Sequence, residues 1–172
     1  MALNDGNLDL KEVERRLDRQ IRKIKGRTER GVIRAAIVII RGTEKASPST
    51  PVDTGNLRAS RFVVTSRGET EEGQSPAFVD SESAEAGRMS ADHAAMLSNT
   101  TREAKTFKGP TAIIGYTAFY AAAVHEKVGA NFKRKRPPAA GSKWLAASMK
   151  RNRDEVLDKI EKEVKGSGAR KR

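Results

Sequence analysis

Apolar residues recur every three or four positions through the first quarter of the chain, which is the spacing of one face of an α-helix. The pattern predicts a helix over residues 9–45, and Asp9 with Glu12 forms a capping box before its first turn. The series consists of Leu10, Val13, Leu17, Ile21, Ile24, Thr28, Val32, Ala35 and Ile39.

The two halves of this helix differ in polarity. The first half is strongly basic on its remaining faces, whereas VIRAAIVII at 32–40 is apolar almost all round. Because a helix with apolar residues on every face is buried on several sides, we expect a basic end that projects freely and an apolar end inside the core. Gly26 and Gly31 each cost about 1 kcal/mol relative to Ala in a helix interior, which indicates a bend or a close crossing.

A short linker and two strands are predicted next. Pro48 and Pro51 end the helix and hold residues 46–53 in an extended path. FVVTSR at 62–67 and TAIIGY at 111–116 are rich in β-branched residues, which is typical of strands. The turn and the first strand together occupy residues 51–67.

The segment between these strands, residues 68–106, is too long for a hairpin loop. AFVD at 77–80 is a candidate third strand. Residues 83–105 have a helical pattern, with Met89, His93, Met96 and Leu97 on one side. We therefore expect an inserted surface helix, and since His93 follows Asp92 on it, we expect His93 to be solvated.

The last third of the chain predicts two further helices. Residues 117–126 favour a short helix capped by Thr117, which follows the second strand and so completes a strand–helix unit over 111–126. A basic loop over 127–141 separates it from a second long helix over 142–165. Ser142 is the expected N-cap of that helix, and its apolar stripe consists of Leu145, Met149, Val156, Ile160 and Val164.

These elements predict a single α+β domain over residues 1–172. A long N-terminal helix and a C-terminal helix would pack on a small antiparallel β-sheet, with an inserted helical segment. Aromatic residues make up 5% of the chain, so the core is expected to be mainly aliphatic. The predicted core consists of Ile37, Ile40, Phe62, Val64, Ile113, Tyr120, Trp144, Leu145 and Ile160.

The charge of the chain indicates which kind of partner it binds. The 172 residues carry a formal net charge of +12, which predicts an anionic partner such as nucleic acid, a membrane surface or an acidic protein face. Residues 68–106 hold eight acidic and three basic residues, whereas residues 127–143 hold six basic residues and no acidic one. Each patch is either a solvated surface or a contact between subunits. In the second case we expect the acidic segment to meet a neighbour's basic first helix or its run Lys133, Arg134, Lys135 and Arg136.

Absent sequence features narrow the class of protein. The chain has no Cys, which excludes disulfides and Cys-ligated metals. Its N-terminal residues lack the apolar run of a signal peptide, and no stretch approaches 18 apolar residues. We expect a soluble protein made in a reducing cytoplasm, without membrane contact.

Val52-Asp53-Thr54-Gly55 is the string in which an aspartic protease carries its catalytic carboxylate. That chemistry needs two carboxylates that share a proton, placed on a loop after a buried apolar strand. Here the preceding SPSTP is polar and broken by proline, and Asn56 follows where that family has Ser or Ala. The context favours a turn in which the Asp53 or Thr54 side chain caps NLRAS, an effect worth about 1 kcal/mol.

The remaining motifs predict neither an enzyme nor a cofactor or metal site. His125-Glu126 lacks the second His of the HExxH zinc motif, and no nucleophile elbow, P-loop or GxGxxG is present. Nucleic-acid binding is the alternative function, since the basic first helix and KRKR favour salt-sensitive phosphate contacts. Phe132 is the one aromatic residue near KRKR, so a platform for stacking single strands is not expected.

Three motifs, in order, resemble the head–tail connector or tail-completion (neck) proteins of tailed bacteriophages. The first is a turn formed by Pro51, Val52, Asp53, Thr54, Gly55, Leu57, Arg58 and Ser60. The second follows the second strand and consists of Tyr120, Ala121, Val124, His125 and Glu126. The third lies on the final helix and consists of Trp144, Leu145 and Ala147. The resemblance spans roughly 110 of the 172 residues.

The resemblance implies a non-enzymatic structural subunit, made in the host cytoplasm and located in the neck of the virion. It implies a homo-oligomeric ring, a hexamer or dodecamer, around the DNA channel. Head-closure and tail-terminator or tail-tube proteins would be its neighbours. DNA would pass through the ring without sequence-specific contacts.

Overall fold

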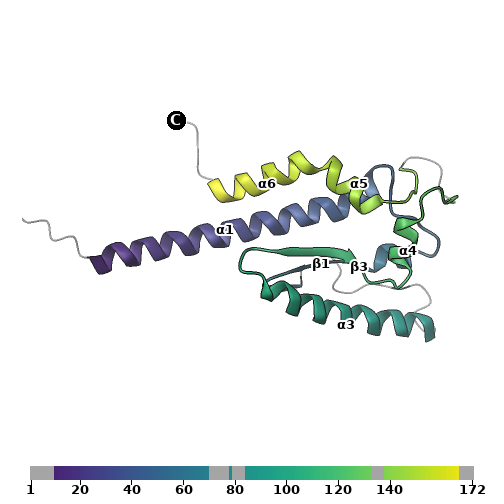
Figure 1. The fold of residues 1–172 in the computed structure, drawn as a ribbon, viewed down its shortest axis with the longest axis horizontal. Coiled ribbons are helices and arrows are strands. Elements are labelled where there is room, and N and C mark those ends of the chain that lie inside the picture. Colours follow the sequence, from purple (N-terminus) through teal and green to yellow (C-terminus); the bar gives the residue numbers. More distant parts are fainter. Residues whose placement is uncertain (1–9, 70–77, 79–83, 133–137, 167–172) are drawn as a thin grey trace, which may run out of the picture.

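The computed structural model in Figure 1 describes residues 10–69, 78, 84–132 and 138–166. Its elements are α1 (Leu10–Lys45), α2 (Asn56–Ala59), β1 (Arg61–Thr65), β2 (Gly68–Glu69), α3 (Ala84–Thr106), β3 (Ala112–Tyr116), α4 (Ala121–Glu126), α5 (Trp144–Arg151) and α6 (Arg153–Lys165). The predicted α+β fold is confirmed, as are the long first helix and the inserted helix.

The described strands form one antiparallel sheet in the order β2-β1-β3. Val63 of β1 is paired with Ile114 of β3, so the two predicted strands lie side by side. The third strand is β2, which follows β1 directly. The strand predicted at 77–80 is not borne out at Phe78, which lies outside any strand, and its other residues lie outside the described part.

Helices cover both faces of the sheet, as Figure 1 shows. Because side chains alternate along a strand, Val63 points to α1, where it meets Ala36 and Ile40. Its neighbours Phe62 and Val64 point to α3 instead. There they pack with Leu97 and Ala104.

The C-terminal helices α5 and α6 lie on the same side of the sheet as α1, but they pack mainly on α1 itself (Figure 1). Trp144 and Leu145 carry the contact to Tyr116 of the sheet. Gly31 permits this close crossing, as the sequence predicted, because a Cβ there would lie 3.0 Å from the Cα of Ile160. Gly42, which sequence analysis did not single out, has the same role, since a Cβ there would clash with the Asn152 side chain.

The prediction of one continuous helix over 142–165 is wrong. The helix is broken at Asn152, whose side-chain amide donates hydrogen bonds to the carbonyl oxygen and Oγ of Ser148, at 2.9 and 3.0 Å. An Asn side chain that bonds to nearby backbone competes with helix continuation. Ser142 is not the N-cap either, because α5 begins after Lys143, which adopts a left-handed conformation with φ of 56°.

The predicted core is confirmed in part. Trp144, Ile40, Phe62 and Val64 are buried, but they lie on opposite faces of the sheet rather than in one cluster. The other five predicted residues are half-buried, and these are Ile37, Ile113, Tyr120, Leu145 and Ile160. A sheet of three short strands is too narrow to cover all nine.

Candidate functional site

The first motif forms a tight turn before β1. Gly55 has φ of 99° and ψ of −16°, a left-handed conformation that glycine adopts without steric cost. Thr54 Oγ1 accepts a hydrogen bond from the backbone N–H of Asn56 at 3.3 Å, but the predicted side-chain cap is wrong, because the N-cap of α2 is Gly55, which has no side chain. Asp53 is exposed and Leu57 is buried.

A hydrogen-bond network fastens this turn to α1 and to the sheet. Arg58 Nη2 donates to the carbonyl oxygen of Thr50 at 3.2 Å. The Tyr116 hydroxyl lies 2.9 Å from Thr50 Oγ1 and 2.8 Å from Thr43 Oγ1, at the end of α1. Burial raises the pKa of Tyr116 above its ordinary value, so its hydroxyl stays protonated and hydrogen-bonded.

The second motif packs against Trp144 of the third. The His125 ring lies edge-on to the Trp144 ring, with the two centroids 4.7 Å apart. The backbone carbonyl oxygen of His125 accepts a hydrogen bond from the backbone N–H of Lys143 at 2.8 Å. Glu126 forms an ion pair with Lys143, and its Oε1 lies within hydrogen-bond distance of His125 Nδ1, at 2.7 Å. Burial, reinforced by the Lys143 charge, lowers the pKa of His125.

The three motifs therefore meet in one cluster. Leu57 of the first motif, Ala121 of the second and Trp144 of the third are among its buried members. These residues join α2, α4 and α5 into one unit. The burial of all three residues assigns them a role in packing.

Two predictions about individual residues near this cluster are wrong. Thr117 does not cap α4, which begins at Ala121; its N–H and hydroxyl donate to the carbonyl oxygen of Ser60 at 2.9 and 3.3 Å. His93 is not solvated but 3% exposed, with Nδ1 2.7 Å from Thr117 Oγ1 and its ring edge-on to Phe78. The insert is thus docked on the core through a buried polar contact.

The structure does not describe several residues that the sequence singled out. Lys133, Arg134, Lys135 and Arg136 lie outside the described residues, as do Glu71, Glu72, Asp80 and Glu82 of the acidic segment. The charge pairing expected between subunits stays a prediction. In the parts of the chain that are described, no three His, Asp or Glu side chains are placed to hold a metal ion. None of the described helices combines the length and apolarity that a bilayer crossing requires.

Comparison of the chain with protein-family models, with curated proteins and with solved structures found no match. The candidate sites therefore rest on the geometry of this chain. Two surfaces stand out, and both involve the projecting half of α1.

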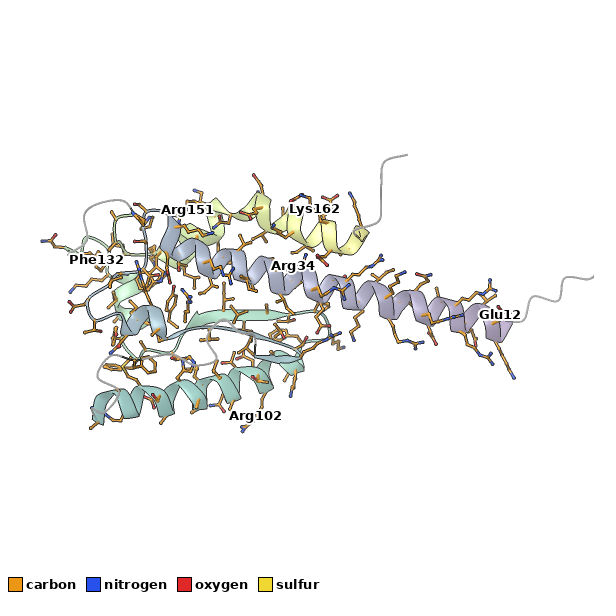
Figure 2. All side chains as sticks on the ribbon, turned by 180° about the vertical axis from the view of Figure 1, so that it is seen from behind. Glu12, Arg34, Arg102, Phe132, Arg151 and Lys162 are labelled. Carbon is orange, nitrogen blue, oxygen red and sulfur yellow. The ribbon has the colours of Figure 1, made fainter. Side chains whose placement is uncertain are left out.

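The first surface is an apolar stripe on α1. This helix projects beyond both the sheet and α6, and Glu12 marks its free end in Figure 2. Every residue from 11 to 25 is exposed, as the sequence predicted for the basic half. The stripe consists of Val13, Leu17, Ile21 and Ile24, which are 44%, 59%, 53% and 51% exposed.

The stripe continues the face of α1 that α6 covers further along. At 3.6 residues per turn, Val13, Leu17 and Ile24 fall within roughly 40° of Gly31, where Ile160 of α6 crosses. Arg30 and Arg34 flank that crossing and form ion pairs with Glu163 of α6. Helix α6 ends at Lys165. Within the described residues, nothing covers the stripe on the part of α1 that extends beyond this end of α6.

The second surface is a groove of about 530 Å³ beneath α1, which we call the basic groove. It lies between α1, the turn that joins β1 to β2, and the loop from α3 to β3. Its lining consists of Arg22, Lys25, Gly26, Glu29, Ser66, Arg67, Lys105, Phe107, Lys108, Gly109 and Pro110.

Sequence analysis predicted the basic half of α1 but missed the other walls of this groove. Arg67, Lys105 and Lys108 belong to segments that are far apart in the sequence, and the fold brings them together. The one local signal was Phe107 between two lysines, in a stretch that was treated as part of an acidic insert and the loop after it.

Proposed function

We propose that this chain is a structural subunit of the head–tail joint of a tailed bacteriophage. In this proposal it forms a ring around the DNA channel in the virion neck and links the head-closure protein to the tail-terminator or tail-tube protein. The ring would be a hexamer or dodecamer, assembled in the host cytoplasm. The order of the three motifs supports this assignment, and so does their convergence on Trp144.

The apolar stripe on α1 is the observation that carries the proposal. Fully burying a Val, Leu or Ile side chain stabilises by about 1.5–3 kcal/mol. Since Val13, Leu17, Ile21 and Ile24 are each about half exposed, a partner that covers all four would contribute about 3–6 kcal/mol per subunit. A projecting helix with such a stripe is typical of an assembly subunit.

A ring satisfies this stripe in every subunit at once. When a projecting element of one copy packs on a different surface of the next, the interface is heterologous, and a suitable rotation closes it into a ring. The face of α1 that α6 covers suggests the kind of partner that the stripe would accept. That partner would be an amphipathic helix with an apolar residue at the crossing, as Ile160 of α6 is at Gly31, and an acidic residue at its edge, as Glu163 is.

A basic DNA-binding protein that acts through phosphate contacts is the second candidate. The net charge of +12 and the basic groove favour it. The two candidates differ in the oligomeric state that they predict. A ring subunit needs a neighbour on its apolar stripe, whereas a DNA-binding protein could act as a monomer.

The mass of the purified full chain in solution tests the proposal. We expect an oligomer far larger than the 18.8 kDa chain, measured by light scattering after gel filtration. Leu17→Gln with Ile21→Gln should yield monomers, whereas the control pair Arg15→Gln with Arg19→Gln, on another face of α1, should leave the oligomer intact. A wild-type chain that stays monomeric at every concentration would favour the second candidate.

A further inference from the structure

The basic groove concentrates positive charge, and four of its cations have no ion pair among the described residues. Arg22 and Lys25 come from α1, and Lys105 and Lys108 come from the end of α3 and the loop after it. No carboxylate among the described residues forms an ion pair with any of these four side chains. Four unneutralised cations around one hollow attract an anion strongly.

An ion pair with a buried carboxylate holds the fifth cation, Arg67, at the rim of the groove. The Glu29 side chain is 8% exposed, and its Oε2 lies 2.6 Å from Nε of Arg67. Ser66 Oγ donates a second hydrogen bond to this carboxylate at 3.3 Å. The guanidinium of Arg67 is thereby fixed at one end, while its side chain remains 68% exposed. An arginine oriented in this way is well suited to phosphate recognition.

An aromatic ring lies among these cations. Phe107 is 49% exposed and lines the groove together with Gly109, at which a Cβ would meet nothing within 4 Å. Sequence analysis found a single aromatic residue near KRKR and expected no stacking platform there. In the groove, by contrast, Phe107 lies among the cations. A base that stacks on an exposed ring typically contributes about 1–3 kcal/mol to single-strand binding.

The groove and the stripe lie on different sides of α1. At 100° per residue, the centre of Arg22, Lys25 and Glu29 is roughly 120° around the helix from the centre of the stripe. Covering the stripe with a neighbouring subunit therefore leaves the groove open. The volume of about 530 Å³ suits a group the size of one nucleotide.

We infer that the basic groove binds the phosphodiester backbone of nucleic acid, with Phe107 stacking on a base of a single-stranded or frayed segment. This inference deepens the proposed function, because a neck channel carries DNA. Binding would be independent of sequence, since phosphate contacts position a strand without reading it. A neighbour's acidic segment is the competing occupant, and the experiment separates the two.

The experiment measures the affinity of the full chain for a fluorescent 30-nucleotide single strand and a 30-base-pair duplex across a salt series. Lys105→Gln with Lys108→Gln should weaken both complexes about tenfold or more at low salt. The salt slope should fall by about 1.4 for the single strand and about 1.8 for the duplex. Phe107→Ala should weaken the single strand about 5- to 100-fold and the duplex much less.

A control pair removes the same charge elsewhere. Lys127→Gln with Lys150→Gln changes two exposed lysines outside the groove and should alter affinity less than threefold. Equal losses for the two pairs would overturn the inference, because DNA would then respond to total charge alone. Displacement of the DNA by polyglutamate as readily as by unlabelled DNA would also overturn it, in favour of an acidic protein segment.

The oligomer mass of each variant separates this inference from the proposed function. A groove variant that assembles normally but has lost DNA affinity supports the inference. A wild-type chain that remains monomeric yet binds DNA through Lys105, Phe107 and Lys108 would contradict the ring and leave the groove assignment standing. Unchanged DNA affinity in the groove variant would contradict the assignment whatever the oligomer mass.

Discussion

At the scale of single residues, Gly55 has a requirement that no other residue type meets at equal cost. Its φ of 99° is strained for any residue with a side chain, although a Cβ there would meet no atom within 4 Å. The penalty of a substitution would therefore come from the backbone rather than from a clash. Left-handed conformations cost non-glycine residues about 1–2 kcal/mol.

Gly55→Val should accordingly lower the free energy of unfolding by about 1–2 kcal/mol or more, measured by urea denaturation. The matched control is Gly87→Ala in α3, where a Cβ also meets nothing and φ is helical. That change should stabilise the protein by about 1 kcal/mol. A Gly55→Val protein as stable as the wild type would show that the turn adopts another conformation.

At the scale of elements, the packing of α5 and α6 on α1 depends on Gly31 and Gly42, although glycine in a helix interior lowers the stability of the helix. Gly42→Ala should destabilise by about 1–3 kcal/mol, because its Cβ would be forced against the Asn152 and Ser148 side chains. Gly26→Ala, on the same helix, should instead stabilise by about 1 kcal/mol, since the added Cβ would approach only the flexible end of the Arg30 side chain, at 4.0 Å. Thermal unfolding of the two variants distinguishes these outcomes. Equal effects would mean that helix propensity, rather than the crossing, decides.

Elements with strong periodicity were predictable from sequence, and elements set by tertiary contacts were not. The spacing of Val13, Leu17 and Ile24 was enough to predict α1. The break at Asn152 escaped prediction, because RNRDEV has the composition of a continuous helix. The break depends on hydrogen bonds to Ser148, whose hydroxyl in turn donates to the carbonyl oxygen of Ile39 on α1 at 2.6 Å. His93 escaped for the same reason, since its burial depends on Thr117 from a distant segment.

The two candidate surfaces differ in the same way. The stripe could be predicted, because it lies on one helix and its residues follow one period. The basic groove could not, because Arg67 and Lys108 approach α1 only after the sheet has formed. A groove lined by three separate segments leaves no regular pattern in the sequence.

At the scale of the whole molecule, the chain combines a packed body with an arm. The body contains the sheet, α3, α5, α6 and the second half of α1, and the arm is residues 10–25, about 24 Å of helix. Glu12 and Arg16 form an exposed ion pair on the arm, and a pair at this spacing contributes about 0.3–0.5 kcal/mol. A helix in water with so little support is marginally stable.

Hydrogen exchange should therefore depend on assembly in the arm and not in the body. In a dilute, monomeric sample, amides of residues 10–25 should exchange at least tenfold faster than in the oligomer. Residues 32–45 should be protected in both, because they are packed in the body. The Leu17→Gln with Ile21→Gln variant should keep the arm fast at all concentrations. Full protection of the arm in the monomer would contradict this prediction.

The marginal stability of the arm helix would control when the subunits of the proposed ring assemble. A newly made subunit would carry a docking element that is only partly folded, and the neighbour it docks on would complete the fold. Early collisions between free subunits would then be short-lived, because each must supply the ordering entropy before any apolar contact is gained. A template that presents several docking surfaces at once, such as a phage head with or without its DNA, would offset this entropic cost. Polymerisation away from the template would thus be slow, without any dedicated inhibitor.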